Sequence, residues 1–523
     1  MSAFEMVHQD RIAGKLVCFD RLIIKGHITK LYPAGAFKGF LDAEGVLLKD
    51  FGSYVTARTD ELKAHAKAMA RDAGRPYLYL GAAHTKAKGS SKEDLARSIA
   101  ERDGITEGLI CVFATVEPCS SFDVNNNAST HRLEIVRRRR KCLYLYSYRI
   151  DAELGFCHVR VQSWFPFEIR AWVNGREALS RALDKAGIGH TRYLNSIVTC
   201  EDWEAAQALA NKLAKRRWPA LLNALARKHN PLINRIGRAG FGGYWWVADQ
   251  VEVATDVAFV DRDSLQEVLP GLFAHATSNF SSTDVLRFLG RKPHPNLTKE
   301  VTSSTRHRPE GWRVKHTMGR NSIKVYNKAN VLRVETTIND PSEFRVLRLQ
   351  AGDDGHRHPA WRPMRKGVAN LGRYHQVARG ANERYLEALS AASDHGEAVK
   401  ALDDLCRPTI HNQRRTASFN PATRSDLALF KAVLAGEHAI VGFRNDDLTN
   451  RLYPRPPSTQ QEARRRSART SRLISKLRGH GLVTKVKDQR LYRVTPQGQR
   501  VMSAALAVHD RDFPAAYEHV LAA

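Results

Sequence analysis

A chain of 523 residues exceeds the size of one hydrophobic core, so three or more domains are expected. Its 43% apolar and 26% charged residues are globular proportions and exclude disorder over most of the length. The 82 Lys and Arg against 54 Asp and Glu give a formal charge of +28, which favours nucleic acid as partner because each phosphate contact releases condensed counterions. A basic surface that only keeps the chain soluble is the alternative.

Membrane attachment and secretion are not expected. The sequence has no run of about 18 apolar residues, and its first twenty residues lack the basic and apolar segments of a secretory signal. We therefore expect a cytoplasmic protein with no membrane partner. Its seven cysteines are irregularly spaced and include no CxxC pair, so reduced thiols are predicted rather than structural zinc.

Residues 1–200 are predicted to form a mixed α/β domain. Helical segments at 60–74 and 91–104 precede three runs rich in Val, Ile, Tyr, Phe and Trp, which are typical of a β-sheet. The segment 131–141 contains Arg137, Arg138, Arg139 and Arg140, which are interpreted either as a solvated strand end or as phosphate contacts. Further along are aromatic residues that are predicted to be exposed on a basic sheet and would then suit base stacking with single-stranded nucleic acid, namely Tyr144, Tyr146, Tyr148 and Trp164.

The fold class predicted for the whole chain is α+β multidomain, with antiparallel-sheet units flanked by helices and a winged helix-turn-helix at the C-terminus. Helical periodicity with basic residues on the opposite face predicts a connector after the first domain. A second strand-rich unit follows, and a Gly, Asp, His and Pro segment then marks a loop. The predicted domains are 1–200 mixed α/β, 201–240 basic helical connector, 241–350 antiparallel β/α core, 351–420 loop and helical linker, and 421–523 winged helix-turn-helix.

Two acids stand among apolar residues in the second strand-rich unit, Asp256 in VATDVAFVD and Glu335 in VLRVETTIN. A buried carboxylate is costly unless it is paired or binds metal, and two of them would suit one Mg²⁺ or Mn²⁺ ion. Strand alternation places Lys324, Tyr326 and Lys328 on one face.

These residues suit covalent DNA nicking. A metal polarises the phosphate, a lysine neutralises charge, and the phenolate attacks phosphorus. The alternative is structural: Tyr326 is then an ordinary sheet aromatic, and Glu335 is a salt-bridge partner of Arg333 or Arg313.

The segment from Thr255 to Asn339, with its TDVAFVD, GRNSIKVYNK and LRVET runs, resembles the core of trans-acting rolling-circle replication initiators of small plasmids and phages. That resemblance implies metal ligation by Asp256 and Glu335 and DNA nicking by a tyrosine. The segment departs from the family pattern at Asn327, where an aspartate is usual, and at Ala254, where an arginine is usual. With its FDRLIIKG start and WFPF segment, the whole chain also resembles a group of long bacterial proteins of undetermined role.

The C-terminal unit begins with a helix over 425–436 and a short helix opening at Asn445. A long helix follows from about Glu462 to Arg478, with arginines on one face and leucine and isoleucine on the other. A two-armed hairpin and a closing helix capped by Thr495 complete a pattern that resembles the winged helix of MarR-type regulators. The predicted phosphate or base contacts are Arg464, Arg465, Arg466, Arg469, Arg472, Lys476, Lys487 and Arg490.

The sequence therefore predicts a DNA-binding protein of a mobile-element or replication-initiator type, with metal-dependent DNA nicking as its candidate activity. The alternative is a non-catalytic winged-helix transcriptional regulator, or a protein that binds RNA or single strands. A winged helix used only for protein contact is a further interpretation of the C-terminal unit. The absence of a GxxxxGK[ST] loop argues against ATP-driven remodelling, and no GxSxG or HExxH motif is present.

Overall fold

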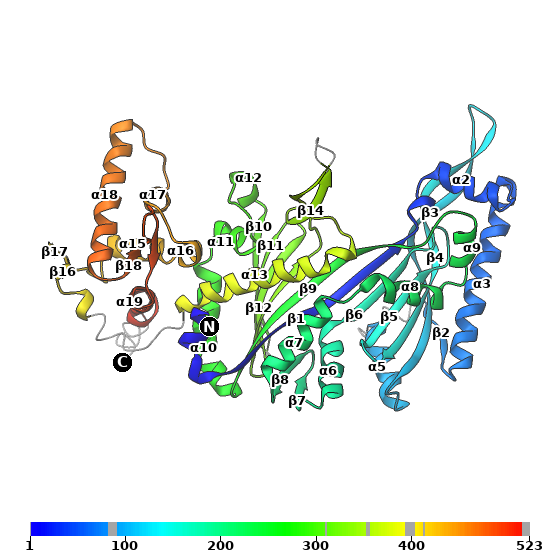
Figure 1. Cartoon of the computed structure of the whole chain (residues 1–523), viewed down its shortest axis with the longest axis horizontal. Helices are drawn as coiled ribbons and strands as arrows, with labels where there is room; N and C mark the ends of the chain where they lie inside the picture. Colours follow the sequence, from blue (N-terminus) through cyan, green and yellow to red (C-terminus); the bar gives the residue numbers. More distant parts are fainter. Residues whose placement is uncertain are drawn as a thin grey trace. The chain divides into compact units, whose positions relative to one another are not determined.

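A computed structural model describes residues 2–81, 91–308, 311–351, 356–392, 403–411 and 414–514 (Figure 1). Part of the predicted helical linker, residues 393–402, lies outside the described residues. Within them the chain is a mixed α and β protein with a large sheet of strand order β10-β11-β12-β13-β9-β1-β6-β5-β4-β3-β2. No helix in these ranges is both long enough and apolar enough to cross a membrane.

Contacts divide the chain into two compact units, each built from separate stretches of sequence. Unit 1 comprises Met1–Lys15, Thr255–Thr336 and Arg379–Ala523, and unit 2 comprises Leu16–Ala254 and Thr337–Ala378. This division differs from the five consecutive domains predicted from the sequence. The reason is that its four limits fall inside regular elements, whereas composition changes mark only loops. These elements are the strands β1 (Ile12–His27), β9 (Trp245–Phe259) and β13 (Val331–Ile338) and the helix α13 (Leu371–Leu389).

Unit 2 holds most of the antiparallel sheet, with a parallel pair only at β2–β3 among the printed registers. Helices pack on this sheet because each buries an apolar stripe. The strands besides β1 and β9 are β2 (Tyr77–Tyr79), β3 (Gly108–Asn127), β4 (Arg132–Asp151), β5 (Gly155–Gln162) and β6 (Ile169–Asn174). Two hairpins are β7 (His190–Tyr193) with β8 (Ser196–Cys200), and β14 (Arg345–Ala351) with β15 (Arg357–Pro363). The helices are α2 (Ala34–Ala43), α3 (Phe51–Asp72), α5 (Lys92–Arg102), α6 (Gly175–Ala186), α7 (Trp203–Ala214), α8 (Trp218–His229) and α9 (Ile233–Arg238).

The segment 201–240, predicted as a basic connector, forms α7, α8 and α9 of unit 2. Trp218 is 1% exposed and Leu222 is fully buried, and both belong to the main core of the unit. The segment is helical, as its periodicity predicts, but its apolar face packs into a core instead of linking two domains. A sequence pattern alone shows that a face is apolar and does not show what it packs against.

The tyrosines predicted to stack on bases are buried. Tyr144, Tyr146 and Tyr148 have exposed fractions of 4%, 8% and 0%, because α5 covers their face of the sheet and packs Ala96 and Ile99 against them. Burial raises the pKa of each of these tyrosines. The exposed-aromatic prediction is therefore wrong for them, and Trp164 is only half buried.

Unit 1 contains the other edge of the sheet. Its strands are β10 (Val301–Arg308), β11 (Gly311–Met318), β12 (Asn321–Lys328), β13 and the end of β9, and antiparallel registers join β10 to β11 and β11 to β12. One face carries the apolar side chains that pack with the helices, such as Val314, which lies opposite Val325. The helices are α1 (Ala3–Val7), α10 (Arg262–Ser278), α11 (Ser282–Phe288), α12 (Pro295–Thr298) and α13 (Leu371–Leu389), of which Arg379 onward belongs to this unit.

The C-terminal part of unit 1 has a core of its own, which includes Phe430, Leu448, Leu477 and Met502. Phe443 pairs with Tyr492 beside a short hairpin. Its elements are β16 (Thr409–His411), β17 (Arg414–Thr416), α15 (Arg424–Val433), α16 (Gly436–Val441), α17 (Asn445–Leu452), α18 (Gln460–Gly479), β18 (Val483–Lys485), β19 (Tyr492–Val494) and α19 (Pro496–Ala507).

The buried His316 should make unit 1 sensitive to acid. Its Nδ1 lies 2.8 Å from Ser303 Oγ and its Nε2 lies 3.0 Å from Tyr385 Oη, and burial lowers its pKa to about 4. The unfolded chain takes up this proton near the ordinary pKa of about 6.5, so the stabilisation is complete above that pH and is lost as the pH falls towards 4. We expect wild type to lose on the order of 3 kcal/mol more than His316→Gln between pH 7 and pH 4, measured by denaturant unfolding.

The control for that experiment is His307→Gln, since His307 is an exposed histidine on β10 of the same unit. It should leave the pH dependence of wild type unchanged. Equal pH dependence in wild type and His316→Gln would contradict the expectation.

Candidate nucleic-acid interface and acidic cluster

One face of the unit 1 sheet carries a group of basic side chains around a tyrosine. The register places Arg313 opposite Tyr326 and Lys315 opposite Lys324. On the next strand Arg306 lies opposite Arg313, so the same row continues to the sheet edge. These side chains are half-buried or exposed, whereas on β11 and β12 the residues between them, Val314 and Val325, are buried. The sequence prediction that Lys324, Tyr326 and Lys328 share a face agrees with this alternation.

Two side chains of this basic face contact the carboxylate of Glu335. Tyr326 Oη donates to Glu335 Oε2 at 2.6 Å, and Lys324 Nζ lies 2.7 Å from Glu335 Oε1. Lys328 adds its ammonium 5.5 Å from the centre of the Tyr326 ring. Burial acts to raise the pKa of Glu335, but Lys324 and the Tyr326 hydroxyl outweigh it, so the pKa lies below its usual range and Glu335 is ionised.

Asp256, predicted as a metal ligand, is paired with an arginine in the structure. Its two carboxylate oxygens accept hydrogen bonds from Arg333, from Nε at 2.6 Å and from the terminal nitrogen at 2.8 Å, and both side chains are fully buried. This bidentate pair satisfies the charge of Asp256 within the sheet. Asp256 therefore fits a structural ion pair and does not fit the metal pair with Glu335 that the resemblance implied. One structural alternative was a salt bridge between Glu335 and Arg333. In the structure, Arg333 forms its salt bridge with Asp256.

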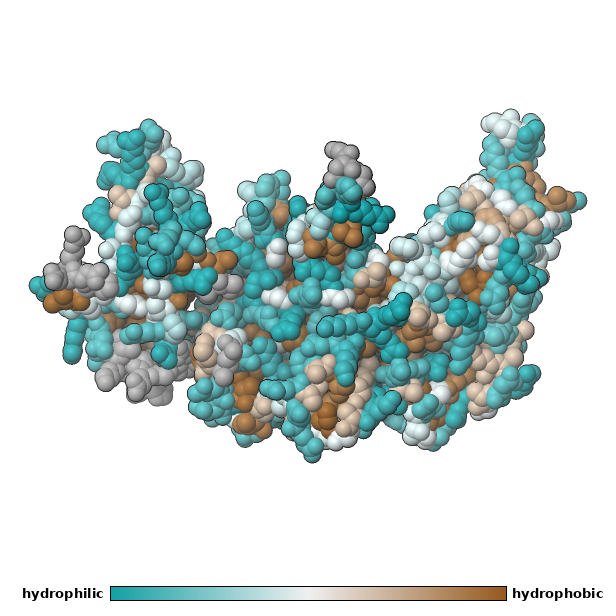
Figure 2. Space-filling model, viewed as in Figure 1, coloured by the Kyte–Doolittle hydropathy of each residue, from teal (hydrophilic) through white to brown (hydrophobic). Residues whose placement is uncertain are grey.

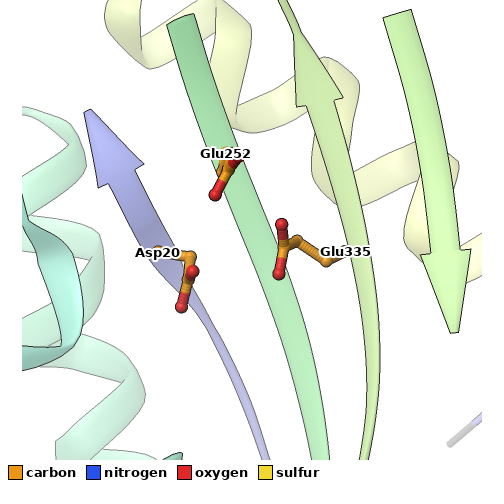
Figure 3. A group of neighbouring side chains, drawn as sticks. All are labelled: Asp20, Glu252 and Glu335. Atoms are coloured by element: carbon orange, nitrogen blue, oxygen red, sulfur yellow. The ribbon is translucent and has the colours of Figure 1, made fainter. Parts of the chain in front are cut away.

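Glu335 groups with two acids that the sequence prediction missed, Asp20 and Glu252. One ligand oxygen from each lies within 4.8 Å of the others, and all three are buried. Figure 3 shows their carboxylates on three neighbouring strands, β1, β9 and β13. Three buried carboxylates at this spacing suit a divalent cation such as Mg²⁺ or Mn²⁺, since hard cations prefer oxygen ligands. Among the described residues this is the group of acids that could hold a metal ion.

Neighbouring polar groups orient these acids. Asn195 Nδ2 donates to Asp20 Oδ1 at 2.6 Å, and Gln250 Nε2 donates to Glu252 Oε1 at 2.6 Å. The sequence carried a weak signal for both acids. Asp20 interrupts an apolar strand in LVCFDRLII, and Glu252 precedes Asp256 by four residues, which places the two on the same strand face.

The α18 helix (Figure 1) has a hydrophilic outer surface (Figure 2), and several of its basic residues are exposed. Its buried residues are Thr470, Ile474 and Leu477, which face the C-terminal core. The exposed arginines, which form no ion pair with any acid in the described part of the chain, are Arg464, Arg465, Arg469 and Arg472.

Two of the basic residues predicted on this helix have partners within the chain. Arg466 lies against Glu462 and also donates to the backbone oxygen of Arg455. Lys476 lies 3.6 Å from Asp426 and 3.9 Å from the centre of the Phe419 ring. In the hairpin, the predicted contacts Lys487 and Arg490 are exposed.

The arginine run of unit 2 lies on β4, where β3 and β4 extend past α2 as a two-stranded ribbon (Figure 1). Arg140 lies 2.7 Å from Asp123, and Arg138 donates to Asn125 Oδ1 at 3.1 Å. Arg137 donates to Ser120 Oγ at 3.1 Å, while Arg139 is exposed. The charged groups of these arginines lie on the surface of β4. This placement agrees with both interpretations of the arginine run, a solvated strand end or a phosphate contact.

No protein-family model matches this chain, and neither the curated proteins nor the solved structures that were searched include a match. The molecule is thus described by its own geometry: a mixed α and β chain with a large sheet, a buried acidic cluster and several basic surfaces.

Proposed function

We propose that this chain binds DNA through the C-terminal part of unit 1, as a protein of a mobile-element or replication-initiator type. The observation that carries the proposal is the row of exposed arginines on α18 beside a short basic hairpin. We infer that α15, α17, α18 and the β18–β19 hairpin together act as a winged helix-turn-helix. In such modules a helix enters the major groove and the hairpin contacts the backbone.

The experiment that tests this proposal measures binding of the purified full chain to a random 30-base-pair duplex, its single strand and an RNA of the same sequence. Fluorescence anisotropy at increasing salt should show the tightest binding with the duplex, together with an affinity that falls steeply as salt rises. Preference for the single strand or the RNA would favour the alternative of a single-strand or RNA-binding protein. No binding to any of the three would contradict the proposal.

A second candidate function is DNA nicking, and the contact between Tyr326 and the ionised Glu335 favours it. In this scheme Glu335 takes the proton of the Tyr326 hydroxyl. The phenolate oxygen forms a bond to phosphorus while a strand oxygen leaves and takes up the proton that Glu335 had received, which produces a phosphotyrosine adduct and a free hydroxyl end. Lys324 and Lys328 hold the phosphate, and a divalent cation on the acidic cluster would supply further charge neutralisation.

Nicking is tested by incubating the full chain with supercoiled plasmid in Mg²⁺ or Mn²⁺. We expect relaxed circles from wild type and a loss of at least about 100-fold in rate with Tyr326→Phe, because no other group replaces the nucleophile. Glu335→Gln should lower the rate while retaining some adduct. The control is Tyr193→Phe, which removes an exposed hydroxyl of unit 2.

Binding without cleavage in either metal would exclude nicking of this plasmid and leave the non-catalytic regulator. Cleavage that survives Tyr326→Phe would reject Tyr326 as the nucleophile.

A further inference from the structure

Unit 2 contains a cavity of about 690 Å³ that none of the sites described above uses. It lies between α8, α9, the glycine-rich segment 240–243 that follows α9, and the start of β9. Its volume falls within the range of about 300 to 1,000 Å³ that is usual for small-molecule sites. The cavity belongs to unit 2 alone.

The charges around this cavity all have one sign. Its lining includes Lys30, Arg227 and Arg238 and contains no aspartate or glutamate. Lys30 Nζ donates to the backbone oxygen of Gly240 at 3.0 Å, which holds this ammonium beside the glycine-rich segment. Arg227 and Arg238 are exposed, and neither forms an ion pair with an acid in the described ranges. Such a site attracts an anion, and guanidinium groups are suited to phosphate.

Helix geometry explains why the two arginines meet here. On α8, Asn223 and Arg227 are four residues apart and so face the same side. On α9, Asn234 and Arg238 have the same spacing and also line the cavity. The α8 and α9 helices therefore each contribute one side-chain amide and one guanidinium to the lining of the cavity.

An exposed indole lies in this cavity. Trp245 is 59% exposed, although it stands between two buried aromatic residues, Tyr244 and Trp246. The next residue, Trp246, is 5% exposed and donates from Nε1 to Asn223 Oδ1 at 2.8 Å, which anchors this end of the strand. An exposed tryptophan beside cationic groups offers a surface for stacking a nucleobase.

Glycines keep the remaining wall open. A Cβ atom added at Gly237, Gly242 or Gly243 would meet no other atom within 4 Å, so the backbone here is accessible to a ligand. Gly242 has a φ of +76°, a conformation that other residues rarely adopt.

We propose that this cavity binds a nucleotide, with its phosphate on Arg227, Arg238 and Lys30 and its base against Trp245. The nucleotide comes either as a free nucleoside phosphate or as the phosphorylated end of a nucleic-acid strand, which share this chemistry. The site is separate from the α18 surface, and its occupancy does not depend on the DNA binding proposed above.

The test titrates the full chain with ATP, adenosine and inorganic phosphate by isothermal calorimetry and by tryptophan fluorescence. ATP should bind saturably and more tightly than either fragment, and it should quench a component of the emission that is missing from Trp245→Phe. Arg227→Ala and Arg238→Ala should each weaken ATP binding by about tenfold or more, because each removes a charge-assisted contact. Trp245→Ala should weaken it by a similar factor.

The matched control is Arg217→Ala, which removes an exposed arginine at the other end of α8, about 15 Å along the helix axis. It should leave ATP binding unchanged. Competition with a 20-nucleotide strand carrying either a 5′-phosphate or a 5′-hydroxyl identifies the source. Displacement of ATP only by the phosphorylated strand supports the site as one for a strand end, and no displacement by either strand supports a free nucleotide.

The proposal is overturned if ATP does not bind saturably, or if Arg217→Ala weakens binding as much as the two cavity variants. These results leave the DNA-binding proposal untouched, since that is tested with duplex DNA and with substitutions on α18.

Discussion

Alanine substitution of the four exposed arginines of α18 is expected to weaken duplex binding by the full chain by at least about 100-fold at physiological salt. Each of these guanidinium groups reaches solvent and lacks an acid partner in the described part of the chain, so its charge is available to a phosphate. The variant is Arg464→Ala, Arg465→Ala, Arg469→Ala and Arg472→Ala combined. Its folding should be close to that of wild type because the buried face of the helix is unchanged.

The salt dependence of binding shows whether the affinity is lost through phosphate contacts or through another cause. A plot of log Kd against log salt has a slope of about 0.9 for each phosphate neutralised on duplex DNA. If all four arginines contact phosphates, the slope of the variant should be smaller by about 3.6 than that of wild type. An arginine that reads a base edge would instead change the preference among duplex sequences. Anisotropy titrations between 50 and 300 mM salt measure both effects.

The control for net charge is a second quadruple variant in unit 2. It also lowers the formal charge from +28 to +24, since each variant removes four basic side chains from the chain. If it weakens binding as much as the α18 variant, the attraction is a property of the total charge, and α18 is not the interface. The exposed residues that it replaces by alanine are Lys49, Arg71, Arg102 and Lys185.

The elements of the C-terminal part were predictable because their signals are local. The predicted long helix, from about Glu462 to Arg478, agrees with α18 to within two residues at each end. Thr495 accepts from Gly498 N at 2.9 Å, as expected of an N-cap before Pro496. Each signal lies within a few residues of the feature that it predicts. How these elements contact DNA depends on a partner and stays a prediction.

The pairing of charges was less predictable because it depends on strand register. Asp256 and Glu335 look alike in sequence, since each is an acid among β-branched residues. The fold places Arg333 against Asp256, 77 residues away in the chain, and Lys324 against Glu335. Alternation along one strand predicts a shared face, but only the neighbouring strands decide which charges meet. The acidic cluster was missed for the same reason, because its members come from three strands.

Replacing Asp256 by asparagine is expected to destabilise unit 1 by about 3 to 5 kcal/mol, which corresponds to a fall of roughly 10 °C in its unfolding temperature. Asparagine has nearly the same shape but carries no charge. The fully buried guanidinium of Arg333 would then lack a counter-ion in a place that water does not reach. Calorimetry of the full chain measures the shift.

A surface ion pair of the same unit provides the control. Arg11 lies 2.8 Å from Glu267, whose side chain is 65% exposed, so Glu267→Gln should cost no more than about 1 kcal/mol. A double variant, Asp256→Leu with Arg333→Met, should recover most of the stability because both buried charges are then removed together. Similar losses from Asp256→Asn and Glu267→Gln would contradict the structural role of the buried pair.

The same variants separate the structural role of Asp256 from metal binding. A cation that binds only the folded state raises the unfolding temperature as its concentration increases. Because Arg333 occupies both carboxylate oxygens of Asp256, any stabilisation by Mn²⁺ should have the same size in wild type and in Asp256→Asn. It should disappear in Glu335→Gln, whose carboxylate belongs to the acidic cluster. Loss of the Mn²⁺ effect in Asp256→Asn alone would assign the metal to Asp256, as the resemblance to replication initiators implied, and would reject the ion pair as its main role.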